Sequence, residues 1–113
     1  MAKKRAPPTV TNIRLGPYDI PVRYVERLEN RAGERLLGAI NMDEKKLDID
    51  TPLPLLTQAH CLWHEIIHSF SHLTGREHFD EGTINALAHF ILDVMRRNPE
   101  FVELCTYEDR SES

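Results

Sequence analysis

Two patterns of apolar positions divide the chain near residue 51. Before that point, short apolar and β-branched runs alternate with turn signals and predict strands at 20–25, 35–41 and 46–50. The last run alternates strictly between polar and apolar residues, and a tight turn joins it to the run before it. We therefore expect a small antiparallel sheet, and the pattern leaves open whether residues 9–15 add a strand.

After residue 51, apolar positions recur at helical spacing. Pro52 and Pro54 suit a first helical turn, and Gly75 suits the end of that helix. The apolar stripe of this helix consists of Leu55, Ala59, Leu62, Ile66, Phe70 and Leu73. A second helix is predicted over residues 80–97, and Asn98 with Pro99 opens a short third one. The expected fold class is α+β, with about three strands followed by three helices.

Length and charge restrict the classes of function. With 113 residues and a net charge of −4, the chain fits one domain, 1–113, and not a nucleic-acid surface or a polybasic membrane module. No apolar run approaches the roughly 20 residues that span a bilayer. Cys61 and Cys105 form no disulfide framework, so we expect reduced thiols in a cytoplasmic protein. Residues 1–8 and 109–113 are expected to be disordered tails.

The sequence HEIIH, residues 64–68, is the strongest chemical signal within the first predicted helix. His64 and His68 are four residues apart and lie on one helix face, so both imidazoles can reach one metal ion. Glu65 projects to one side of them, where it can act as the base for a metal-bound water. Zinc suits such mixed imidazole and carboxylate ligation, so Zn²⁺ is the expected cofactor.

Four histidines occur at four-residue intervals, but they cannot share one ion, because each step drifts around the helix and rises about 6 Å. They are His60, His64, His68 and His72. Only the middle pair has a glutamate directly after its first histidine. We therefore expect His60 and His72 to be capping or surface residues, or neighbours of the metal ligands.

A third protein ligand is expected, since a catalytic zinc usually has three. Glu77, His78, Asp80 and His89 are possible, but helix arithmetic favours Glu81. If the two helices form an antiparallel hairpin, Glu81 returns to the level of His68, each about six residues from the turn. Asp80 has the competing role of helix N-cap, and Glu81 could instead stabilise the helix N-terminus.

The segment HEIIH, followed by EGTINALAHFIL at 81–92, resembles the ImmA/IrrE family of small metallopeptidases. Its pattern is H-E-x-x-H, then E-x-x-A-N-x-F-A-x-x-L-L. The positions that match the second part are Glu81, Asn85, Ala88 and Leu92. Ile84 and Leu87 stand where the family has alanine and an aromatic residue. The resemblance implies a minimal zincin-like (gluzincin) fold in a bacterium or a phage-infected host, and it makes Asn85, with His72, a candidate neighbour of the ligands.

The expected activity is peptide hydrolysis, with zinc on His64, His68 and Glu81 and with Glu65 as general base. A second donor to the oxyanion is expected, and His72, His78 and Tyr24 stay open as candidates. The strand at 37–41 could pair with an extended substrate. The resemblance implies a protein or peptide substrate, such as a repressor-like regulator of a phage or mobile element. The alternative hypothesis is a zinc-stabilised binding module that has lost catalysis.

Overall fold

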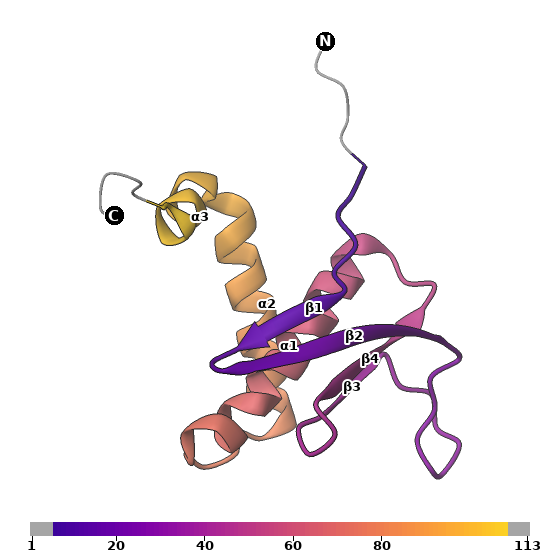
Figure 1. The fold of residues 1–113 in the computed structure, drawn as a ribbon. Helices are drawn as coiled ribbons and strands as arrows, with labels where there is room; N and C mark the ends of the chain where they lie inside the picture. The colour runs from indigo at the N-terminus through magenta and orange to yellow at the C-terminus, as the bar shows by residue number, and fades with distance from the viewer. Residues whose placement is uncertain (1–5, 109–113) are drawn as a thin grey trace.

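The structure is a computed structural model that describes residues 6–108, in which four strands precede three helices (Figure 1). These elements are β1 (Asn12–Leu15), β2 (Tyr18–Glu26), β3 (Gly38–Asn41), β4 (Lys46–Thr51), α1 (Leu55–Thr74), α2 (Glu81–Arg97) and α3 (Pro99–Thr106). The α+β class is confirmed, and β1 answers the open question about residues 9–15. Residues 6–8 are exposed and have no regular structure. The remaining residues of the two expected tails, 1–5 and 109–113, lie outside the described range.

The sheet is mixed, so the prediction of a purely antiparallel sheet is wrong. Its strand order is β1-β2-β4-β3. The β1–β2 and β3–β4 pairs are antiparallel, whereas β2 and β4 run parallel, with Val22 opposite Leu47. Residues 27–37 connect β2 to β3, which are not neighbours in the sheet. β4 lies between these two strands and pairs with both. The central place suits β4, because Leu47 and Ile49 are fully buried.

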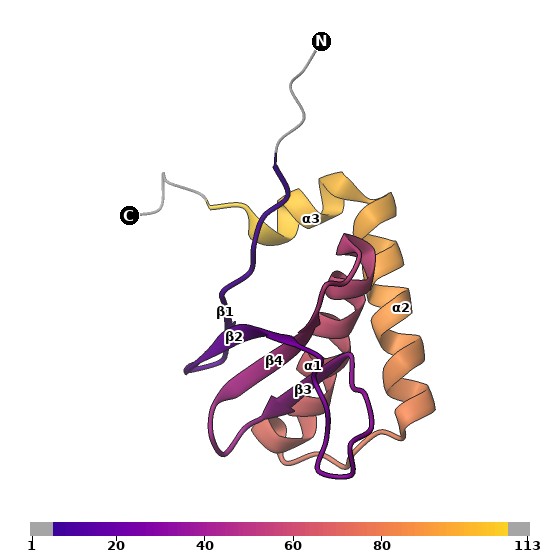
Figure 2. The same cartoon turned by 90° about the vertical axis from the view of Figure 1, so that its right-hand side faces the viewer.

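Helix α1 is the middle layer of the molecule, between the sheet and α2 (Figure 2). One side of it contacts β3 and β4, and another side packs along α2. Ile67 of α1 forms a buried cluster with Ile84 and Ala88 of α2. The histidines that border this second side therefore face α2.

The predicted apolar stripe of α1 is only partly buried. Leu62 and Leu73 pack against the core of the sheet, but Leu55 is 56% exposed and Phe70 is 37% exposed. The buried positions of α1 are Cys61, Glu65, Ile67, Ser69 and Ser71. The sheet covers a face of α1 that is rotated around the helix from the predicted apolar stripe. This covered face includes Glu65.

The turn between α1 and α2 forms as the sequence predicts. Gly75 ends α1 in the left-handed conformation, with φ of 71°, which glycine adopts without steric cost. Asp80 caps α2, and its carboxylate accepts a hydrogen bond from the Thr83 N–H at 2.7 Å. The two helices run antiparallel as a hairpin (Figure 2). Within residues 6–108, no helix is long and apolar enough to cross a membrane.

Candidate metal centre

A cleft of about 390 Å³ opens between β3, α1 and α2. The residues that line it are Leu36, Leu37, Gly38, His60, Cys61, His64, Glu65, His68, Glu81 and Asn85. These residues come from three segments that are far apart in the sequence. The segment before β3 gives an apolar wall, and both helices give polar side chains. The HEIIH sequence thus lies at the centre of a cleft.

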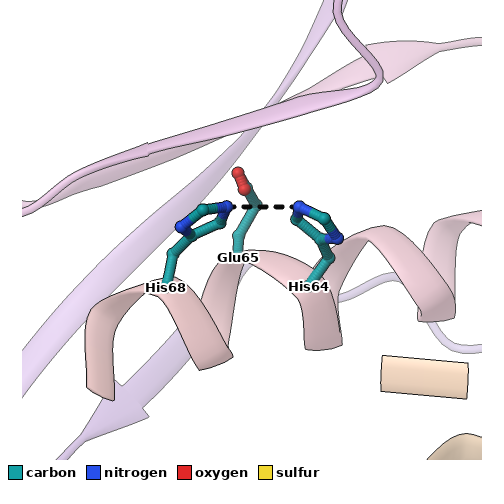
Figure 3. Close-up of side chains that lie close together, drawn as sticks. All are labelled: His64, Glu65 and His68. Carbon is teal, nitrogen blue, oxygen red and sulfur yellow. Dashed lines mark hydrogen bonds between the residues drawn. The ribbon is translucent and has the colours of Figure 1, made fainter. Parts of the chain in front are cut away.

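The rings of His64 and His68 point toward each other across one turn of α1 (Figure 3). Their Nε2 atoms are 3.2 Å apart, and both side chains are mostly buried, with 23% and 30% exposure. Two imidazole nitrogens can approach this closely when a proton or a cation lies between their lone pairs. The helix therefore brings two nitrogen ligands to one point.

Glu81 reaches this point from the first turn of α2. One carboxylate oxygen is 3.1 Å from His64 Nε2, and the other is 2.9 Å from His68 Nε2. This contact agrees with the level that helix arithmetic gave for Glu81. The Glu81 side chain is 72% exposed, so it lies at the rim of the cleft, whereas the histidines lie deeper.

Glu65 lies behind the two imidazoles, on the side of α1 that faces the sheet (Figure 3). It is buried, and its Oε2 atom has no hydrogen-bond partner among the described residues. Burial raises the pKa of Glu65 to about 7, and the negative charge of Glu81 adds to the rise. A cation held by the two histidines would favour the ionised carboxylate and lower this pKa.

His64, Glu65 and His68 form a group that could hold a metal ion, since their ligand atoms all lie within 4.8 Å of one another. Glu81 also contacts both imidazoles, so two carboxylates are within reach of the same point. They differ in environment, because Glu65 is buried and Glu81 is exposed. This difference allows distinct roles for the two carboxylates.

The close approach of β3 to α1 explains the burial of Glu65. A Cβ atom on Gly38 would lie 3.5 Å from Glu65 Cγ and 3.2 Å from the Ile49 side chain. Asp50 anchors the chain on this side, because its carboxylate accepts hydrogen bonds from the Leu28 N–H at 2.8 Å and from Arg35 at 3.1 Å. The Leu28 hydrogen bond is the main reason why the pKa of Asp50 is lowered. A buried carboxylate thus holds the cleft wall against the sheet.

The three candidates for a second oxyanion donor lie away from the cleft. His72 and His78 are exposed, and the Tyr24 hydroxyl donates a 2.7 Å hydrogen bond to the Val10 carbonyl. None of them is among the residues that line the cleft. Asn85 does line it, one helical turn after Glu81, as does Cys61, whose pKa burial raises. Asn85 therefore lines the cleft together with the proposed ligands, whereas His72 does not.

His60 lines the cleft and is paired with a histidine of α2. Its ring stacks on the ring of His89, with centroids 3.8 Å apart, and its Nε2 atom is buried without a hydrogen-bond partner in the described chain. Burial lowers the pKa of His60, and the nearby His89 lowers it further. The i, i+4 series of histidines was a signal that His60 borders the site. Nothing in the sequence indicated its pairing with His89.

Comparisons with protein-family models, with curated proteins and with solved structures find no match to this chain.

Proposed function

We propose that this chain is a zinc-dependent peptidase of the ImmA/IrrE type, with His64, His68 and Glu81 as metal ligands and Glu65 as general base. The observation that carries the proposal is the convergence of two imidazoles and one carboxylate on a single point beside a buried glutamate. A merely structural histidine pair requires neither the cleft nor the second carboxylate.

The distances support zinc. Ligand atoms about 2.0–2.1 Å from a tetrahedral zinc ion lie roughly 3.3 Å from one another. The Nε2 atoms of His64 and His68 are 3.2 Å apart, close to this value, and each of them has a different oxygen of Glu81 at 3.1 or 2.9 Å. Imidazole and carboxylate are also the donors of several catalytic zinc sites. When bound, zinc would polarise a peptide carbonyl and acidify the attacking water.

Glu65 has the position and environment of a general base. Its unpartnered Oε2 atom can accept a proton from the attacking water and then give it to the nitrogen of the leaving amine. A cation held by the histidines would lower the pKa of Glu65 from about 7 and so favour the carboxylate form, which accepts a proton. The burial of Glu65 also keeps competing water molecules away from the carboxylate.

The outer edge of β3 gives an extended substrate a place to bind. β3 is the last strand of the sheet, and Gly38 at its start lines the cleft beside Glu65. A peptide that paired with this edge would lie across the imidazoles, with its backbone bound and its side chains free. This arrangement favours a protein or peptide substrate, such as a repressor-like regulator.

The test compares the parent with Glu65→Gln and with Glu77→Gln, a matched control in the exposed turn. We expect both variants to keep the zinc content and melting temperature of the parent. Cleavage of a complex peptide library should fall about 10²–10⁴-fold in Glu65→Gln, because the variant cannot accept the proton. It should be unchanged in Glu77→Gln. Zinc content is measured by metal analysis, and new peptide termini are mapped by mass spectrometry.

Three results would contradict the proposal. Equal cleavage by the parent and by Glu65→Gln would remove Glu65 from the reaction. If the zinc-loaded parent cleaved no peptide, the cleft would instead be that of a zinc-stabilised binding module. Loss of zinc in Glu65→Gln would show that Glu65 is itself a ligand.

A further inference from the structure

A second hollow borders the cleft at His60 and lies toward the far end of α2. It has a volume of about 460 Å³ and lies between the first turns of α1 and the last turns of α2. His60 lines both the cleft and this hollow, so the two spaces meet at its ring. We call this space the far hollow. Its other lining residues include Leu56, His89, Leu92 and Arg96.

The far hollow combines apolar walls with one free positive charge. Leu56 is 50% exposed and Leu92 is half-buried, so a ligand can cover both side chains. Asp93 also lines the hollow, but Arg97 binds its carboxylate at 2.9 Å. Arg96 has no carboxylate partner among the described residues. The hollow therefore presents an uncompensated guanidinium beside apolar surface.

Arg96 and its neighbour Arg97 could both stabilise the C-terminal end of α2, so this role does not distinguish them. Both arginines lie in the last turn of α2, where positive charge interacts favourably with the helix dipole. Arg97 is neutralised by Asp93 and does not line the far hollow. Arg96 alone has the combination of free charge and a place on the hollow. This difference points to a ligand with negative charge.

The distance from the metal centre suits a bound peptide. From His64 to Leu56 the α1 axis covers eight residues, or roughly 12 Å. An extended chain crosses that distance in about three or four residues. A substrate that lies across His64 and His68 can therefore place one of its side chains beside Arg96.

We infer that the far hollow is a specificity subsite for a carboxylate of the substrate, three or four residues from the bond that is cleaved. A guanidinium binds a carboxylate through paired hydrogen bonds, and the adjacent leucines would contact the aliphatic part of the same residue. This inference rests on the proposed peptidase function. It assigns Arg96 to substrate selection and not to the reaction itself.

The test uses peptides that the zinc-loaded parent cleaves, resynthesised with Glu or Gln at each position in turn. We expect kcat/KM to be roughly threefold to tenfold higher with Glu at one position on one side of the bond. Arg96→Ala should abolish this preference, and Arg96→Lys should keep part of it. Arg31→Ala, at an exposed position in the loop between β2 and β3, is the control and should leave the preference unchanged. Peptides with free or amidated C-termini separate a terminal carboxylate from a side-chain one.

A preference for Glu that survives in Arg96→Ala, or no preference at any position, would overturn the inference. If the zinc-loaded parent cleaves no peptide, a set of extended peptides, synthesised with Glu or Gln at each position in turn, tests the far hollow instead. Their binding to the zinc-loaded protein is then measured by fluorescence anisotropy, with Glu and Gln versions compared. A preference for Glu that Arg96→Ala removes would support the subsite although the peptidase proposal had failed. Equal binding of the two versions would overturn the subsite as well.

Discussion

Two close histidine pairs, one within α1 and one between α1 and α2, differ in how their rings meet. His64 and His68 meet tip to tip, with Nε2 atoms 3.2 Å apart and a carboxylate beside both. His60 and His89 meet face to face, with centroids 3.8 Å apart and planes inclined by 29°. Lone pairs lie in the plane of an imidazole ring, so only the first pair directs two of them at one point. Close histidines therefore indicate a metal centre only when their edges converge.

The largest expected effect comes from removing each pair in turn. The double variant His64→Ala, His68→Ala should lose zinc almost completely, because two of three proposed ligands are gone. The double variant His60→Gln, His89→Gln should keep about one zinc ion per chain, since its stacked rings are not ligands. Metal analysis after dialysis measures both. Equal zinc content in the two variants would erase the distinction between the pairs.

A smaller effect is expected from removing Glu81, the carboxylate that lies beside His64 and His68. Glu81→Ala should weaken zinc binding by more than the roughly 10–100-fold that loss of an outer partner costs. Asp80→Ala should weaken the helix cap, lower the melting temperature, and leave zinc affinity close to that of the parent. Competition with a chelator measures the affinity, and thermal unfolding measures the stability. Greater zinc loss in Asp80→Ala than in Glu81→Ala would show that Asp80, and not Glu81, is the third ligand.

The smallest expected effect concerns the wall beside the first pair. The pKa of Asp50 is lowered in the folded protein, mainly by the Leu28 hydrogen bond and also by Arg35. Its stabilising contribution is therefore present above the unfolded pKa of about 3.9 and is lost as pH falls through the lower folded value. Asp50→Asn should lower the melting temperature near pH 7, with a smaller difference from the parent in acid.

Melting curves of the zinc-free protein between pH 2 and pH 7 measure this difference. Asp43→Asn, in the exposed turn between β3 and β4, controls for the loss of one negative charge. A constant difference between the parent and Asp50→Asn at all pH values would contradict the role of the ionised carboxylate. Because Asp50 holds the wall beside Glu65 and not the far hollow, the variant should leave the Glu preference of the far hollow intact.

Local signals in the sequence determined the helices and the point where they meet. Gly75 and Asp80 mark the turn, and the fixed rise of a helix places Glu81 at the level of His68 once the hairpin is antiparallel. The spacing of His64 and His68 is also local, since four residues make about one turn. These relations depend on neighbours along the chain, so the periodicity of the sequence carries them.

Only the tertiary structure decided which strands pair and which face of α1 is buried. The sequence pattern does not show that β4 enters between β2 and β3, because strand pairing depends on contacts between distant residues. The same long-range packing brings Gly38 against Glu65. As a result Glu65 is buried, whereas Phe70 of the predicted apolar stripe stays 37% exposed. This packing also stacks His60 on His89 and places Arg96 beside a second hollow that His60 shares with the cleft. Periodicity measures which face of a helix is most apolar, whereas the sheet and the neighbouring helix determine which face they cover.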